Sequence, residues 1–177
     1  FYVSWFDNAA GGYDVRLQRL SATGVELWPH NGVLVADRNL SSTTDYGLSV
    51  DTAGNALLAF NDDSEASERI VAAKISPDGL AIWGTPGIAV STSTGFLASP
   101  RIAGTDDGAV VVAWFQVSDT VLQRLDPAGA KLWATDGLVL AHSGDTFVVA
   151  DLQATGSNGG LDTGNVVVSW VRYVTFA

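Results

Sequence analysis

A tryptophan spaced between two glycines recurs three times in this chain of 177 residues, in VELWPHNGVLVA (25–36), LAIWGTPGIAVS (80–91) and AKLWATDGLVLA (130–141). In each copy one glycine lies four residues before the tryptophan and another lies four residues after it. Self-similarity at a period of this length is the signature of a protein built from stacked repeats. The three sets are Gly24, Trp28 and Gly32; Gly79, Trp83 and Gly87; and Gly129, Trp133 and Gly137.

A second pattern runs through the chain with the same period. Because two patterns keep the same phase from end to end, the repeat covers almost the whole chain. The second pattern is an aromatic residue at or near the end of an apolar stretch. Its copies are separated by 55, 54 and 56 positions and are Trp5, Phe60, Trp114 and Trp170. A turn-forming glycine precedes each of the last three by six residues, at Gly54, Gly108 and Gly164.

Each repeat divides into four short extended segments separated by turn-forming residues. No stretch has an apolar period of 3.6 residues long enough for a helix, so the sequence predicts an all-β fold. In the most complete copy the predicted strands cover 47–51, 55–61, 69–76 and 87–91.

The apolar pattern predicts which strands are buried. The runs ALLAF (56–60) and VVVAW (110–114) do not alternate, which is typical of strands covered on both faces. YDVRLQRL (13–20) alternates, so we expect Asp14, Arg16 and Gln18 to face solvent. Four-stranded units with a central strand dry on both sides are typical of β-propeller blades.

Counting strands along the chain gives units of three, four, four and two. We therefore expect about three blades plus partial ones, in one β-propeller segment that forms an incomplete arc. Each repeated tryptophan is expected to cover the contact between its own blade and the next one. The predicted units are approximately 1–46, 47–97, 98–146 and 147–177.

The repeat resembles the propeller-like repeats of large secreted or cell-surface bacterial proteins. The resemblance rests on residues 17–24, 28–36 and 54–60 with their sister copies. It implies an extracellular structural or binding protein and specifies a blade rather than an activity.

Composition excludes several classes of partner and site. With 19 acidic and 9 basic residues, and a net charge of −10, the chain is a poor match for nucleic acids or anionic membranes. It has no cysteine, which excludes disulfides and thiolate metal sites, and only two histidines, His30 and His142, which we expect at the surface. No apolar run approaches the roughly 20 residues that span a bilayer, so membrane insertion is not expected.

The acidic loop NDDSEASE (61–68) is the one candidate metal site. Clustered carboxylates suit a hard cation, so Asp62, Asp63 and Glu65 are candidate calcium ligands; the alternative is a solvated loop. Calcium is the only cofactor that the sequence leaves open.

Two other residue sets are candidates for contacts. Exposed aromatic rings could stack on sugars, and Tyr46, Phe96 and Phe147 precede the first strands of their units, where a propeller opens its channel. The alternative is that they pack beneath loops. Three cations share one repeat position and would either tie a blade to its neighbour or lie on a solvated face; they are Arg19, Lys74 and Arg124.

These observations favour a non-catalytic extracellular repeat module that serves as a scaffold or binds protein or glycan. The alternatives are part of an extracellular carbohydrate-active propeller enzyme and a subunit of an extracellular polymer. The expected partners are the rest of a larger chain, or further copies that complete the ring, and a glycan or surface protein. No catalytic residue is predicted.

Overall fold

The computed structural model describes residues 1–9, 11–39, 45–65, 67–141, 143–156 and 164–174. The described residues form thirteen strands and no helix, which confirms the all-β prediction. The strands pair antiparallel in four sheets of three, four, four and two strands, the count expected from the sequence. Among the described residues there is no helix with the length and apolar character needed to cross a membrane.

Each sheet is built from strands that follow one another along the chain. The first sheet comprises β1 (Tyr2–Asp7), β2 (Asp14–Arg19) and β3 (Val33–Ala36). The second comprises β4 (Tyr46–Val50), β5 (Ala56–Asp62), β6 (Arg69–Ile75) and β7 (Ile88–Ala89). The third comprises β8 (Leu97–Gly104), β9 (Val110–Gln116), β10 (Asp119–Leu125) and β11 (Leu138–Leu140). The fourth comprises β12 (Asp145–Ala154) and β13 (Val166–Val174).

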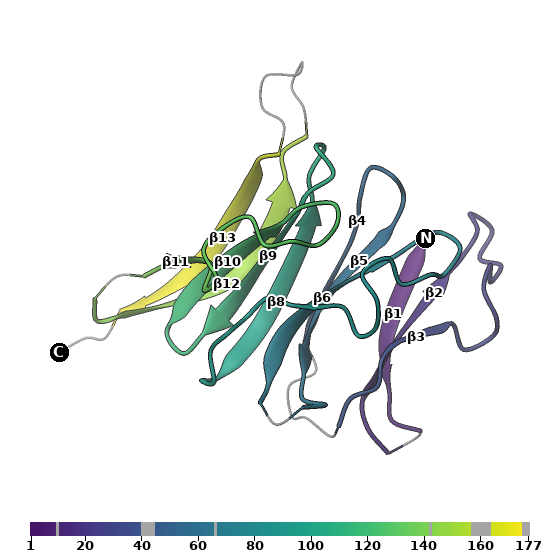
Figure 1. Ribbon diagram of the computed structural model, residues 1–177, viewed down its shortest axis with the longest axis horizontal. Helices are drawn as coiled ribbons and strands as arrows, with labels where there is room; N and C mark the ends of the chain where they lie inside the picture. The colour runs from purple at the N-terminus through teal and green to yellow at the C-terminus, as the bar shows by residue number, and fades with distance from the viewer. Residues whose placement is uncertain (10, 40–44, 66, 142, 157–163, 175–177) are drawn as a thin grey trace.

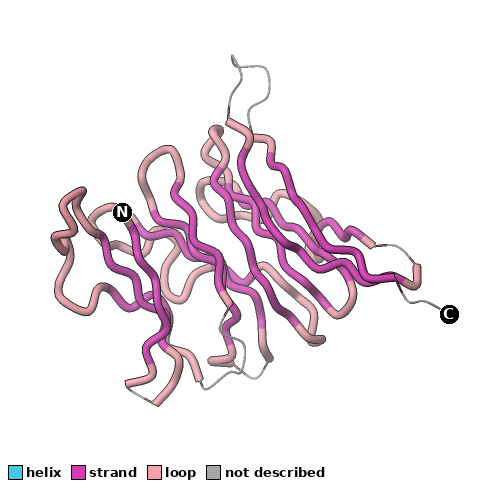
Figure 2. Tube along the Cα trace, turned by 180° about the vertical axis from the view of Figure 1, so that it is seen from behind, coloured by secondary structure: helices cyan, strands magenta, loops and turns pink. Residues whose placement is uncertain are grey.

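The four sheets lie in a row in chain order, face against face (Figure 1). The same row is seen from behind in Figure 2, with the hairpin turns and loops gathered at the ends of the strands. The chain therefore has three contacts between neighbouring sheets, which we call the first, second and third seams.

Strand β5 shows how one sheet serves two seams. Side chains alternate between the faces of a strand, so consecutive residues enter different cores. Leu58 packs in the first seam with Val15 and Leu17, whereas Leu57 packs in the second seam with Val112. All seven residues of β5 are buried. This is the double-sided burial that the continuous apolar run predicts.

Strand β9 repeats the arrangement one sheet further on. Val112 and Trp114 face the second seam, and Val111 and Ala113 face the third. At the two ends of the row no further sheet is present in the described chain. Apolar side chains are therefore exposed there, including Val3, which is 45% exposed, and Val167, which is 59% exposed.

The glycine after each tryptophan allows a close approach of two backbone segments. At Gly32, Gly87 and Gly137 φ is positive, and a Cβ atom would lie 2.2 to 2.4 Å from a carbonyl oxygen of β2, β6 and β10, respectively. No side chain fits at that distance. The glycine is therefore required by the backbone of the neighbouring strand rather than by the indole ring.

One prediction about β2 is wrong. Asp14 is 6% exposed and Gln18 is 4% exposed, although their alternating pattern indicated a solvent-facing side. Arg16 is partly exposed and pairs with Asp7 at 2.9 Å. Gln18 is covered because the loop that carries Trp28 folds back over it.

Candidate functional site

The repeated tryptophans join neighbouring sheets by the same contact in two seams. The Nε1–H group of Trp28 donates to the carbonyl oxygen of Pro77 at 3.0 Å, and that of Trp83 donates to Pro127 at 3.1 Å. Pro77 and Pro127 lie in equivalent turns of the following sheet. The indole rings lie against the glycines of those turns, Gly79 and Gly129, where a Cβ atom would meet ring atoms at 3.4 and 3.2 Å.

A buried glutamine holds the tryptophan loop in two of the repeats. The amide oxygen of Gln18 accepts from the backbone N–H of Trp28, and its amide nitrogen donates to the carbonyl of Pro29. Gln123 makes the equivalent bonds to the backbone of Trp133 and Ala134. The sequence analysis missed this role, although the shared LQRL motif that precedes both loops contained the signal.

The three cations at one repeat position behave differently. Arg19 donates to Pro77 across the first seam at 3.0 Å, and Arg124 donates to the carbonyl of Gly164 across the third seam at 2.7 Å. Lys74 instead pairs with Asp51 of its own sheet at 2.9 Å, so the expected contact with the neighbouring sheet is wrong for Lys74.

Carboxylates at the first hairpin turn of the second and third sheets are used as hydrogen-bond acceptors. Burial alone would raise the pKa of Asp51, but hydrogen bonds from Asn55 and Lys74 outweigh it and hold that pKa below its ordinary value. The hydroxyl of Thr105 is the main cause of the lowered pKa of Asp107. Both carboxylates therefore stabilise turns as anions.

The predicted calcium ligands lie at the last residue of β5, Asp62, and in the loop that follows it. Both oxygens of Asp62 accept protein donors, one from Arg69 and one from the backbone of Ser64. Glu65 also pairs with Arg69, at 3.0 Å, and Asp63 accepts from the backbone of Asn39. No group of three acidic or histidine side chains converges on one point within the described residues. Calcium binding at this loop stays a prediction.

The three aromatic residues considered for ligand stacking lie in three different sheets or their connections. Tyr46 donates its hydroxyl to the carbonyl of Ser4 and lies in the first seam, where its ring contacts Phe6. Phe147 is 9% exposed, whereas Phe96 is 59% exposed. Phe96 is thus the one of the three whose ring is open to a ligand; its binding role stays a prediction.

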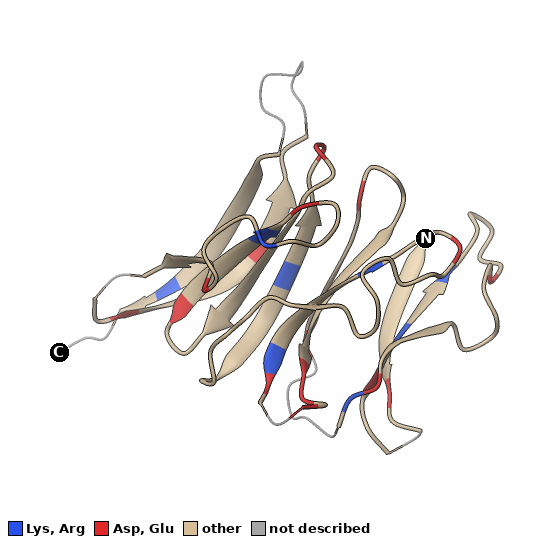
Figure 3. Ribbon diagram, in the orientation of Figure 1, with Lys and Arg blue, Asp and Glu red and all other residues tan. Residues whose placement is uncertain are grey.

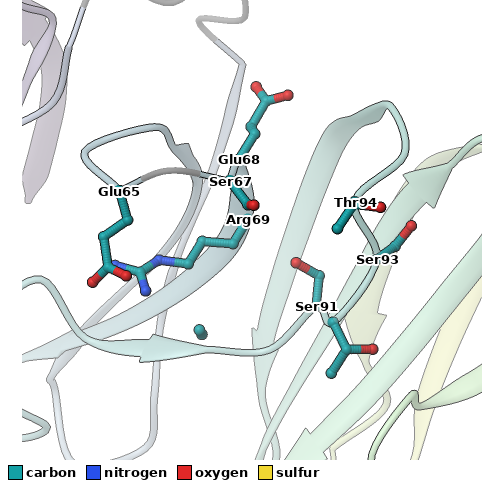
Figure 4. Close-up of a pocket in the computed structure, with 9 residues that line it drawn as sticks. Glu65, Ser67, Glu68, Arg69, Ser91, Ser93 and Thr94 are labelled. Carbon is teal, nitrogen blue, oxygen red and sulfur yellow. The ribbon is translucent and has the colours of Figure 1, made fainter.

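A depression of about 390 Å³ lies between the segment at the start of β6 and the chain that leaves β7 (Figure 4). Hydroxyl side chains dominate its lining, together with Arg69 and two glutamates. The residues are Glu65, Ser67, Glu68, Arg69, Ala89, Ser91, Thr92, Ser93 and Thr94. The sequence analysis did not identify this depression, because its two sides are separated along the chain.

The chemistry of the depression suits binding rather than proton transfer between carboxylates. The carboxylates of Glu65 and Glu68 point in different directions, and Arg69 extends toward Glu65 (Figure 4). Paired acids acting on one bond must face a shared substrate. Ser67 and Thr94 are exposed and carry hydroxyl groups that can donate to or accept from a polar ligand.

Charged groups outside the depression are distributed over all four sheets and their turns. His30 is exposed and pairs with Glu26 at 3.1 Å, while His142 lies outside the described residues. Acidic side chains gather in turns, and basic ones are scattered over several sheets (Figure 3). No family model, curated protein or solved structure matches the chain.

Proposed function

We propose that this chain is a run of β-propeller blades that serves as a non-catalytic repeat module of an extracellular or cell-surface protein. The observation that carries the proposal is the repetition of one seam contact. Trp28 and Trp83 bind equivalent carbonyls in the following sheet, and strands β5 and β9 pack on both faces. Sheets that cover one another in this way form a rigid scaffold rather than a flexible linker.

The role we propose for this scaffold is binding of a neutral polar ligand, of which a glycan is the best chemical match. The depression between β6 and β7 offers several hydroxyl groups, and its one cation, Arg69, is already paired with Asp62 and Glu65. A phosphate or sulfate would have to displace those carboxylates. A neutral sugar can exchange hydrogen bonds with the hydroxyls without that cost.

A glycan array combined with a hydrolysis assay tests this proposal. We expect the chain to retain neutral glycans and to leave them uncleaved. Thr94→Arg, which places a bulky cation at the depression, should abolish binding. Thr23→Arg introduces the same side chain at an exposed turn of the first sheet and should leave binding intact.

Two results would contradict the proposed function. Turnover of any bound glycan would identify an enzyme. Equal binding by the two arginine variants would show that the depression is not the binding site.

A further inference from the structure

The hairpin turn between β9 and β10 has a backbone conformation that its sequence disfavours. Val117 has a φ of 60°, and the N–H of Ser118 donates to the carbonyl of Gln116 at 2.7 Å. A hydrogen bond between residues two apart, around a positive φ, defines the rare and strained form of the γ-turn. A positive φ is least favourable for a β-branched residue, and two-residue hairpin turns usually carry Asn or Gly instead.

Burial of the side chain does not offset this strain. Val117 is 62% exposed, so its methyl groups gain little from packing within the chain. The neighbouring segment nevertheless leaves room for them, because a Cβ atom at Gly95 would lie only 2.5 Å from Cγ2 of Val117. Strained residues of this kind are concentrated where a protein contacts a ligand.

Val117 lies beside the depression between β6 and β7. The same Cβ position at Gly95 is 3.4 Å from Oγ of Ser93, which lines the depression. The side chain of Val117 and the hydroxyl of Ser93 therefore flank one point in space. The backbone N–H of Val117 also donates to the carbonyl of Phe96 at 2.9 Å, which holds the turn against the segment that carries Ser93 and Thr94.

This wall of the depression is fixed from both neighbouring sheets. Oγ of Ser91 accepts from the backbone N–H of Ile70 in β6 at 2.8 Å, and the hydroxyl of Thr92 donates to Asp136 of the third sheet at 2.5 Å. Oγ of Ser93 accepts from a backbone N–H of its own segment at 3.0 Å, so its hydrogen can be donated to a ligand. A wall held in this way loses little conformational freedom on binding.

We propose that Val117 is a specificity-determining contact for a sugar ring with a flat apolar face. A pyranose ring whose hydroxyl groups are equatorial presents C–H groups on its faces and polar groups around its edge. The face rests on Val117, and the edge exchanges hydrogen bonds with Ser93 and Thr94. This inference rests on the proposed function and deepens it by naming the class of sugar and an apolar contact.

The assignment gives the strained turn a physical reason. Asn or Gly at position 117 would relax the backbone but would present no branched apolar surface to the sugar. Stability and binding therefore make opposite demands on this position. A substitution that relaxes the turn should move the two properties in opposite directions.

Val117→Asn separates the two demands, because asparagine tolerates positive φ and lacks the methyl groups. Cellotetraose, a neutral chain of glucose rings with flat apolar faces, is the probe in isothermal titration calorimetry. Val117→Asn should raise the urea midpoint of unfolding and weaken cellotetraose binding by roughly tenfold. Val117→Ile keeps a β-branched apolar side chain and should change that affinity by less than about twofold.

Val25→Asn is the matched control. Val25 is 61% exposed and lies next to an exposed turn of the first sheet. The same substitution there should leave the affinity for cellotetraose unchanged. An equal loss of affinity in the two asparagine variants would overturn the proposal.

The other outcomes distinguish this proposal from the proposed function. If Thr94→Arg abolishes cellotetraose binding and Val117→Asn does not weaken it, the apolar contact is wrong and the binding function stands. If the array retains other neutral glycans but cellotetraose does not bind, the flat-faced class of sugar is wrong. If no glycan binds, both proposals are wrong. A lower urea midpoint for Val117→Asn would show that valine stabilises the turn, which would also contradict the contact.

Discussion

Removing the indole of Trp28 should lower the stability of the fold much more than removing an exposed aromatic side chain, because Trp28 lies in the first seam. Trp28 is 9% exposed, its ring lies 5.8 Å from that of Tyr2, and its N–H donates to Pro77. Burying about 200 Å² of ring surface at about 25 cal/mol/Å² contributes at most about 5 kcal/mol. Since buried Trp→Ala changes typically cost about 3–5 kcal/mol, Trp28→Ala should lower the free energy of unfolding by a similar amount.

The conservative variant divides that loss into its parts. Trp28→Phe keeps most of the apolar contact and loses the hydrogen bond to Pro77. The carbonyl of Pro77 still accepts from Arg19, so it is not left without a donor. We expect a loss of about 1–2 kcal/mol, made up of one hydrogen bond and a small packing defect.

Urea unfolding followed by far-ultraviolet circular dichroism measures both variants without relying on tryptophan fluorescence. The midpoint should fall while the slope with urea stays constant. Phe96→Ala is the matched control, because Phe96 is 59% exposed and its loss should change stability by less than about 0.5 kcal/mol. If Trp28→Ala were no more destabilising than Phe96→Ala, the reasoning about the seam would be refuted.

Three further predictions concern the backbone, the seam cations and pH. Gly87→Ala should lower the free energy of unfolding, measured with urea, by more than about 3 kcal/mol, because the new Cβ atom would lie 2.3 Å from a carbonyl oxygen. Gly84 is also at positive φ but has open space around it, so Gly84→Ala should lower the free energy of unfolding by only about 1 kcal/mol. Arg124→Ala should cost about 1 kcal/mol, since it removes a hydrogen bond across the third seam, and an unchanged midpoint would favour a merely solvated side chain. The pKa of Asp51 is lower in the folded chain than in the unfolded chain, so its ionised form stabilises the fold. This stabilisation is fully present at pH values above the unfolded-chain pKa of about 4, and it is lost as the pH falls through the folded-chain pKa. Asp51→Asn should therefore flatten the acid side of the stability profile, and an unaltered profile would contradict the role given to the pair with Lys74.

The strand pattern could be predicted because it depends on local chemistry. Continuous apolar runs such as residues 56–60 can be stable only when both faces of the strand are covered, and the structure buries every residue of β5. Gly32, Gly87 and Gly137 lie at positive φ and so close to a neighbouring carbonyl oxygen that no residue with a Cβ atom fits there. These signals are contained within about ten residues of sequence.

The contacts that could not be predicted depend on residues distant in the chain. Gln18 reads as a solvent-facing residue of an alternating strand, and it is buried only because a loop ten residues later folds over it. The depression beside Ser67 and Thr94 likewise forms from two separate segments. For Asp62 a local signal was present, since Arg69 follows seven residues later and pairs with it.

Methyl–methyl nuclear Overhauser contacts from β5 test the stacked arrangement most directly. Leu57 and Leu58 are consecutive, yet they should contact different sheets. Leu57 is expected to show contacts with Val112 of β9, and Leu58 with Val15 and Leu17 of β2. If either leucine showed contacts to solvent-exposed loops only, or if both contacted the same sheet, the row of mutually covered sheets would be contradicted.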